Sequence, residues 1–69
     1  MNCKIATIAK SELAVLQSLS LGRRVRETAA HLALGAETVR SHLKKAQARL
    51  GVSERTHAVV QAMRQHLIP

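Results

Sequence analysis

The sequence predicts an all-α fold, a compact four-helix domain, from three observations. Gly22 and Gly51, together with a softer break at 33–35, divide the chain into four pieces of helical length. Within each piece, apolar residues recur every three or four positions. No segment alternates between apolar and polar residues over a useful length, so no sheet is expected. We expect one domain over residues 8–69, preceded by an N-terminal tail over residues 1–7.

The first two helices are expected around residues 10–21 and 25–32. In the first, one side carries the apolar residues Leu13, Val15, Leu16 and Leu19. Its start is poorly signalled, because either Thr7 or Ser11 could act as the N-cap. In the second, Val25, Ala29 and Leu32 are expected to face inward, and the residues expected to face outward are Arg26, Glu27 and His31.

The third helix is expected over residues 36–50, with Gly51 ending it as the C′ residue. At about 100° per residue, one narrow stripe of this helix holds Val39, Leu43, Ala46 and Leu50. The opposite side holds Glu37, Ser41, Lys44 and Ala48, with flanks formed by Arg40 and Lys45. We infer that the stripe packs on the other helices. The opposite side then presents long cations around small residues, which let another surface come close.

The fourth helix is expected to begin near Ser53, a good N-cap, and to run to about His66. Its apolar residues are Ala58, Val59, Ala62 and Met63. We expect Val59 and Met63 to close the core, whereas Val60, one residue further round the helix, should face outward.

The composition favours a polyanionic partner. Eleven Lys and Arg against four acidic residues give a formal net charge of +7, which indicates a nucleic acid or simple solubility. The core must be aliphatic, because the chain has no aromatic residue. Cys3 has no partner for an internal disulfide, and no stretch approaches the roughly 18 apolar residues of a membrane helix or shows a secretory cleavage pattern. We therefore expect a soluble cytoplasmic protein in which Cys3 is a free thiol.

The order of the second and third helices is typical of a helix-turn-helix. A short helix, a tight turn and a basic helix with a slim outer side are the parts of this motif, whose second helix fits the major groove of DNA. Ser41 and Ala48 are small, so they let the backbone approach the bases. Taken alone, the third helix is equally compatible with a solvated charged face.

The segment TVRSHLKKAQARLGVSERTHAV, residues 38–59, carries a specific series: Thr-Val-Arg, a His two positions later, Arg-Leu-Gly-Val, Arg-Thr and Ala-Val. With this series, the chain resembles the LuxR-type DNA-binding domain, also called the GerE or FixJ–NarL type, over about residues 8–68. Two further segments match the first helix of that family more loosely, namely ELAVL at 12–16 and GR at 22–23. This resemblance implies sequence-specific binding of double-stranded DNA by a bacterial transcription regulator, with the helix at 36–50 reading the major groove.

By the resemblance, the base-contacting residues are Arg40, Ser41 and Lys44. Arginine suits a bidentate contact with guanine O6 and N7, and lysine reaches the same atoms as a point donor. Residues beside this face are expected to contact phosphates, namely Thr38, Lys45 and Arg49. Arg23 and Arg24, before the second helix, are further phosphate candidates, although loop arginines are often merely solvated.

Three departures from the family pattern concern the caps and the turn. Ala-Lys at 9–10 stands where the family has Thr-Pro, and Arg24 replaces the usual Ser that caps the second helix. In the turn, Ala-Leu-Gly at 33–35 replaces Gly-Ile-Ser. A positive φ at Ala33 would cost about 1 kcal/mol, whereas Gly35 is an acceptable N-cap. We expect these departures to lower the stability of the domain and to leave the reading helix intact.

The residues do not indicate an enzyme, a metal site or a cofactor site. The four histidines form no i, i+4 pair and no cluster with cysteine: His31, His42, His57 and His66. The chain has no Asp, no Ser-His-acid arrangement that its length could position and no glycine-rich phosphate loop. We expect no catalysis, no cofactor and no small-molecule ligand. His42 matches the family's histidine and is expected to pack or to lie on the phosphate side.

By the resemblance, the fourth helix has a role of its own, because family members use it to form a two-fold dimer on DNA. The residues expected at this interface are Val59, Val60 and Met63, and RNA polymerase is a further partner of such a regulator. The alternative, from another class, is a protein-interaction module that pairs with a full-length LuxR-type regulator and inhibits it. A cationic membrane binder is disfavoured, since aromatics and a large apolar face are both lacking. The sequence leaves open whether the chain is a stand-alone regulator or the carboxy-terminal piece of a longer one.

Overall fold

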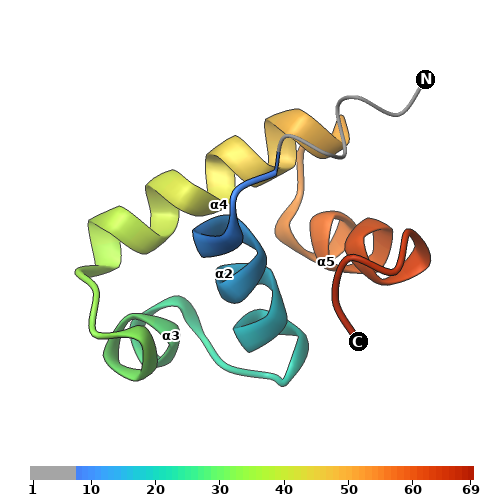
Figure 1. Cartoon of the computed structure of the whole chain (residues 1–69). Helices are drawn as coiled ribbons and strands as arrows, with labels where there is room; N and C mark the ends of the chain where they lie inside the picture. The colour runs from blue at the N-terminus through green and yellow to red at the C-terminus, as the bar shows by residue number, and fades with distance from the viewer. Residues whose placement is uncertain (1–7) are drawn as a thin grey trace.

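The computed structural model describes residues 8–69, and this part of the chain contains helices and connecting turns without a strand (Figure 1). The helices are α2 (Lys10–Ser20), α3 (Val25–Leu32), α4 (Ala36–Leu50) and α5 (Arg55–Arg64). The all-α prediction is therefore confirmed, and the bounds expected for α3 and α4 agree with the structure. The expected tail at 1–7, which includes Cys3 and Thr7, lies outside the described residues.

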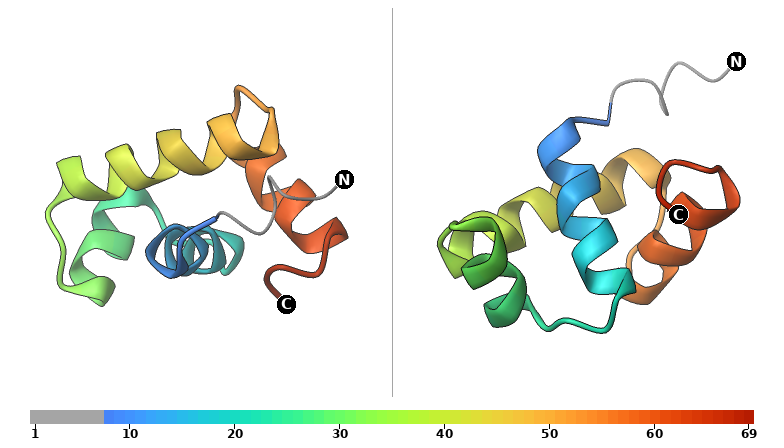
Figure 2. Two further views of the ribbon diagram at one scale, coloured as in Figure 1. Left: turned by 45° about the horizontal axis from the view of Figure 1, so that its top comes forward. Right: turned by 60° about the horizontal axis from the view of Figure 1, so that its bottom comes forward.

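The longest helix, α4, lies across one side of the other three (Figure 1). The turned views in Figure 2 place α3 and α5 at opposite ends of α4, with α2 between them. Helix α2 contacts each of the other three helices. The outward side of α4 is therefore left uncovered along its length.

The core consists of small aliphatic side chains where α2, α4 and α5 meet. Val39, Leu43 and Ala46 of α4 are buried, which confirms most of the predicted stripe, and Leu50 is half-buried. The other buried apolar residues are Ile8, Val15, Leu16, Ala29, Ala58, Ala62 and Ile68. Because alanine is short, its use in α4 and α5 lets these helices approach α2 closely.

The expectations for the fourth helix need correction. Helix α5 begins at Arg55 with Glu54 as its N-cap, so Ser53 does not cap it, and it ends at Arg64, two residues before the expected His66. The expectation that Met63 closes the core is wrong, because Met63 is 46% exposed. Ala62 faces the core instead, and Met63 lies about 100° further round the helix.

Helices α2 and α3 start with a glutamate in place of a capping hydroxyl. Ala9 is the N-cap of α2, so neither Thr7 nor Ser11 is, and its N–H donates to the Glu12 carboxylate at 3.3 Å. Arg24 is the N-cap of α3, and its N–H donates to Glu27 Oε1 at 2.8 Å. In each case the N-cap lacks a side-chain oxygen, as expected, and the glutamate three residues later supplies half of a capping box.

Three of the helices end in the same hydrogen-bonding pattern around a left-handed residue, namely Ala33, Gly51 or His66. After α3, the residue following this position, Leu34, donates its N–H to the carbonyl of Ala29 at 2.8 Å. This is the Schellman arrangement, in which a left-handed residue turns the chain sharply and satisfies the last carbonyls. The turn then leads to Gly35, the N-cap of α4 with φ −77°, as expected.

The turn residue Ala33 has φ 58°, so it adopts the left-handed conformation in which a Cβ is unfavourable. Ala33→Gly should raise the free energy of unfolding by about 0.5–1 kcal/mol, because glycine adopts this conformation without a Cβ clash. Urea denaturation measures the change. The matched control is Ala30→Gly, an exposed position inside α3, which should lower the same quantity by about 1 kcal/mol. If both substitutions destabilised the domain equally, the strain assigned to Ala33 would be wrong.

Candidate nucleic-acid interface

The uncovered side of α4 gathers the predicted base-contacting residues. Arg40, Ser41 and Lys44 are exposed, on the opposite side from the buried stripe. With two further α4 residues they line one shallow depression, and we call these five residues the outer face: Glu37, Arg40, Ser41, Lys44 and Lys45. Packing of the stripe thus fixes which side of α4 a partner can reach.

The start of α4 presents a second feature that suits an anion. The first backbone N–H groups of an α-helix have no partner within the helix, and the helix dipole favours negative charge there. Thr38 is exposed in this first turn. A phosphate placed near Thr38 would therefore meet both its hydroxyl and free N–H groups.

Arg40 is held by an exposed ion pair. Its Nη1 lies 3.1 Å from Glu37 Oε2, one turn earlier on α4, and the two side chains are 52% and 92% exposed. Such an i, i+3 pair at the surface contributes only about 0.2–0.5 kcal/mol. Arg40 can exchange this partner for another at small cost.

Arg49, near the end of α4, makes a much less exposed ion pair. Its Nη1 lies 2.6 Å from Oε1 of Glu12, whose side chain is 4% exposed. Sequence reasoning missed the role of Glu12, because its partner lies 37 residues away. The weak signal available in the sequence was Glu12 itself, a glutamate that begins the otherwise apolar segment ELAVL. The pair fastens the end of α4 to the beginning of α2, and a phosphate contact by Arg49 stays a prediction.

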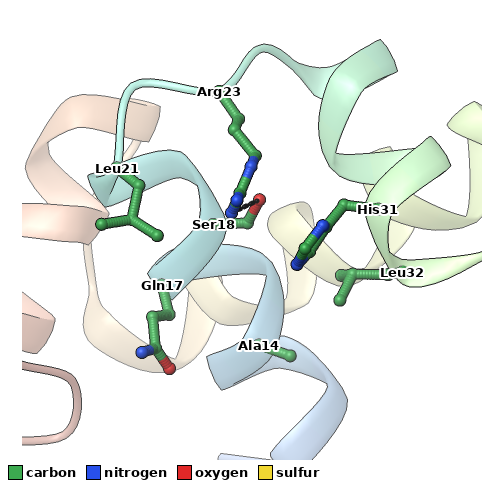
Figure 3. A pocket seen from close by; sticks show the side chains of 7 residues that line it. All are labelled: Ala14, Gln17, Ser18, Leu21, Arg23, His31 and Leu32. Carbon is green, nitrogen blue, oxygen red and sulfur yellow. Dashed lines mark hydrogen bonds between the residues drawn. The ribbon is translucent and has the colours of Figure 1, made fainter.

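Arg23 points inward from the loop between α2 and α3. Figure 3 shows it reaching toward Ser18 on α2, and its Nη1 donates to Ser18 Oγ at 3.4 Å. Ser18 is buried and also shares a 3.0 Å hydrogen bond with Thr28 Oγ1. Figure 3 also shows His31 of α3, which lines a surface pocket together with Ser18 and Arg23. Arg23 therefore helps to join α2 to α3, in addition to its predicted phosphate contact.

The structure brings Arg55 together with the two loop arginines, which sequence reasoning did not foresee. Arg55 opens α5 and lines a depression that Arg23 and Arg24 also line. Arg55 further borders a second depression shared with Arg40 and Lys44. The only sequence signal was the Arg-Thr pair at 55–56 in the family pattern. Cationic residues thus extend from α4 across the start of α5 to the α2–α3 loop.

Helix α5 carries apolar residues on its surface. Val60 is 36% exposed and Met63 is 46% exposed, whereas Val59 is half-buried and packs against the core. Two of the three predicted dimerisation residues are therefore accessible to a partner.

Among residues 8–69, no three His, Cys, Asp or Glu residues lie in a group that could hold a metal ion. Of the helices described, none has the length and apolar character needed to cross a bilayer.

Comparison with known proteins gives consistent matches to a family and to individual regulators. Residues 6–62 match the family described as bacterial regulatory proteins, luxR family. The chain is 36% identical over 61 residues to the probable transcriptional regulatory protein NarL of Mycobacterium tuberculosis, covering 88% of this chain and 28% of that relative. It is 34% identical over 62 residues to the transcriptional regulatory protein LiaR of Bacillus subtilis, covering 90% of this chain and 29% of that relative.

The solved structure of the transcription factor GerE shares the fold, with a TM-score of 0.83 at 24% identity, covering 88% of this chain and 91% of that one. The chain spans less than a third of the length of the NarL and LiaR relatives. The match to the family model nevertheless covers most of the chain. The chain belongs to the luxR family of bacterial regulatory proteins, as a LuxR-type DNA-binding domain.

Proposed function

We propose that this chain binds double-stranded DNA at specific sequences, as part of a bacterial transcription regulator in the cytoplasm, with α4 in the major groove. The observation that carries the proposal is the outer face of α4, where cations surround a small residue opposite a buried stripe. An α-helix about 10–12 Å wide fits the major groove, which is about 12 Å wide.

The proposed base contacts come from one turn of the outer face. Arg40 and Lys44 lie four residues apart, so both side chains can enter the groove together. Arg40 suits a bidentate contact with a guanine, Lys44 donates to a neighbouring acceptor, and Ser41 lies between them, where it contacts a base or permits close approach.

The proposed phosphate contacts surround these residues. Thr38 and Lys45 lie on α4 and are exposed. Arg24 is exposed on the α2–α3 side. Arg23 and Arg49 already donate hydrogen bonds to Ser18 and Glu12. A phosphate contact by either arginine therefore uses its other N–H groups or replaces that hydrogen bond. Such contacts fix the orientation of the protein without reading sequence.

We further propose that two copies assemble on DNA through α5, using Val59, Val60 and Met63. The exposure of Val60 and Met63 supports this proposal. Two copies double the base contacts, which a single small module needs for a useful affinity. A contact with RNA polymerase, which the family resemblance implies, stays a prediction.

Selection of duplexes from a random pool, followed by titration on the selected site and on a scrambled duplex, tests the proposal. We expect binding at least about a thousandfold tighter to the selected site, with a pseudo-palindromic sequence reflecting two copies. The alternative function makes a different prediction. A protein-interaction module would enrich no duplex and would instead bind a full-length LuxR-type regulator and release that regulator from its own DNA.

Two variants separate base reading from phosphate holding. Arg40→Ala should weaken binding to the selected site by about 1–3 kcal/mol and remove discrimination at one base pair in each half-site. Lys45→Ala, one residue further along the outer face than Lys44, should weaken binding to all sequences nearly equally and lower the salt slope by about one for each phosphate that it no longer neutralises. Both variants are titrated on selected and scrambled duplexes at several salt concentrations. An equal loss of affinity on both duplexes for Arg40→Ala would show that Arg40 only clamps a phosphate.

A further inference from the structure

One acidic residue lies within the cationic outer face of α4. Glu37 lines the same depression as Arg40, Ser41, Lys44 and Lys45. Its side chain is 92% exposed, so it is not held in place by burial. Against DNA, a carboxylate in this position meets a field of phosphates, which repels it unless it gains a specific partner.

Two of the other three acidic residues have structural roles that Glu37 does not share, and the third lies outside the outer face. Glu12 binds Arg49 and accepts the Ala9 N–H. Glu27 accepts the N–H of Arg24 at the start of α3. Glu54 stands at the N-cap position of α5 without a side-chain cap hydrogen bond, and it lies beside Arg55. Glu37 contributes to the helix start only through a solvent-screened interaction with the macrodipole.

Its place in α4 suits a contact with a base. Glu37 is the second residue of the helix, and the N-terminal residues of a recognition helix are the ones that reach base edges. Glu37 and Arg40 are three residues apart, an advance of about 4.5 Å along the helix. This is close to the spacing of about 3.4 Å between stacked base pairs. The two side chains can therefore address neighbouring base pairs.

We propose that Glu37 is a specificity-determining residue, whose carboxylate accepts a hydrogen bond from the N4 amino group of a cytosine next to the base pair read by Arg40. This inference rests on the proposed function. In the major groove only cytosine N4 and adenine N6 offer donors, and a carboxylate, which has no donor, matches cytosine because adenine also presents N7, an acceptor. The exposed ion pair between Glu37 and Arg40 then opens on DNA, and each partner gains a base.

A carboxylate also disfavours wrong sequences. Where no amino group is present at that position, Glu37 faces phosphates and base acceptors without compensation, so the mismatch carries an added repulsion. Glu37 thus weakens binding to scrambled duplex while it supports binding to the preferred site.

Three proteins test this inference by selection from random duplexes and by titration on single-base-pair variants of the selected site. The wild type should select a C·G pair next to the pair that depends on Arg40. Glu37→Ala should reduce the preference for that pair by about tenfold. Glu37→Gln should move the preference toward A·T, because an amide offers the donor and acceptor that match adenine N6 and N7.

The matched control is Glu27→Gln, which removes one negative charge from α3 and keeps an acceptor for the Arg24 N–H. It should leave the preference at every base pair unchanged. Circular dichroism and urea unfolding establish that each variant folds. If both Glu37 variants kept the wild-type preference at every position, the inference would be overturned while the proposed function stood. A wild type that selected no sequence would instead remove the proposed function itself.

Discussion

Replacing Arg49 with alanine is expected to lower the free energy of unfolding by about 3 kcal/mol, the largest stability effect of any substitution considered. Arg49 binds the Glu12 carboxylate at 2.6 Å, and Glu12 is almost wholly buried. Removal of one partner leaves a buried charge without compensation, which costs about 3–5 kcal/mol. The lower value applies because the Arg49 side chain is 37% exposed. A core in this size range supplies about 3–5 kcal/mol in total, so Arg49→Ala should keep no more than about 2 kcal/mol of stability at 25 °C.

The double variant Glu12→Gln with Arg49→Met tests the cause. It removes both charges and keeps similar volumes, and its glutamine retains an acceptor for the Ala9 N–H. It should therefore be within about 1 kcal/mol of the wild type. Lys45→Ala, on an exposed part of the same helix, should change stability by less than about 0.5 kcal/mol. Urea denaturation followed by circular dichroism measures the free energy of unfolding of each variant. Wild-type stability in Arg49→Ala would mean that the pair does not fasten α4 to α2.

Raising the salt concentration from about 50 mM to about 200 mM should weaken binding to the selected duplex about a thousandfold. A dimer that neutralises about six phosphates releases their counterions, so the logarithm of the affinity falls against the logarithm of salt with a slope near −5. The proposed dimer has enough exposed cations on and beside α4 for this many phosphates, because three are exposed in one chain: Arg24, Lys45 and Arg55.

Fluorescence anisotropy of a labelled duplex, measured at four or more salt concentrations, gives this slope directly. Arg24→Ala should make the slope less steep by about one for each phosphate that is no longer neutralised. Glu54→Gln, which removes a negative charge near the same surface, adds no phosphate contact and should leave the slope almost unchanged. Binding that did not respond to salt would exclude phosphate neutralisation and would favour the protein-interaction module.

Features with a local cause were predictable from the sequence. The stripe from Val39 to Ala46 follows from helical periodicity, and it alone decides which side of α4 is exposed. The left-handed Ala33 followed from comparing the turn with the family pattern, and its φ of 58° confirms that expectation. The sequence alone is therefore enough to locate the cationic residues of the outer face.

Features that depend on distant parts of the chain were not predictable in this way. Met63 and Ala62 are both apolar, and only the way in which α5 packs on α2 and α4 decides that Ala62 is buried and Met63 exposed. The Glu12–Arg49 pair joins residues 37 positions apart. Arg55 meets Arg23 and Arg24 only because α5 folds back beside the α2–α3 loop. Periodicity contains no information about such contacts.

The alanines that bring the helices together also affect the thermodynamics of association. Of the ten buried apolar residues among residues 8–69, four are alanine: Ala29, Ala46, Ala58 and Ala62. An alanine side chain has no rotamers to lose, so burying it costs no side-chain conformational entropy. Helix α4 is seated in the core by Val39, Leu43 and Ala46, of which only Ala46 has no rotamers to lose. If α4 binds DNA as proposed, the entropic cost of ordering falls mainly on long exposed side chains such as Arg40 and Lys44, at about 0.5–1.5 kcal/mol each.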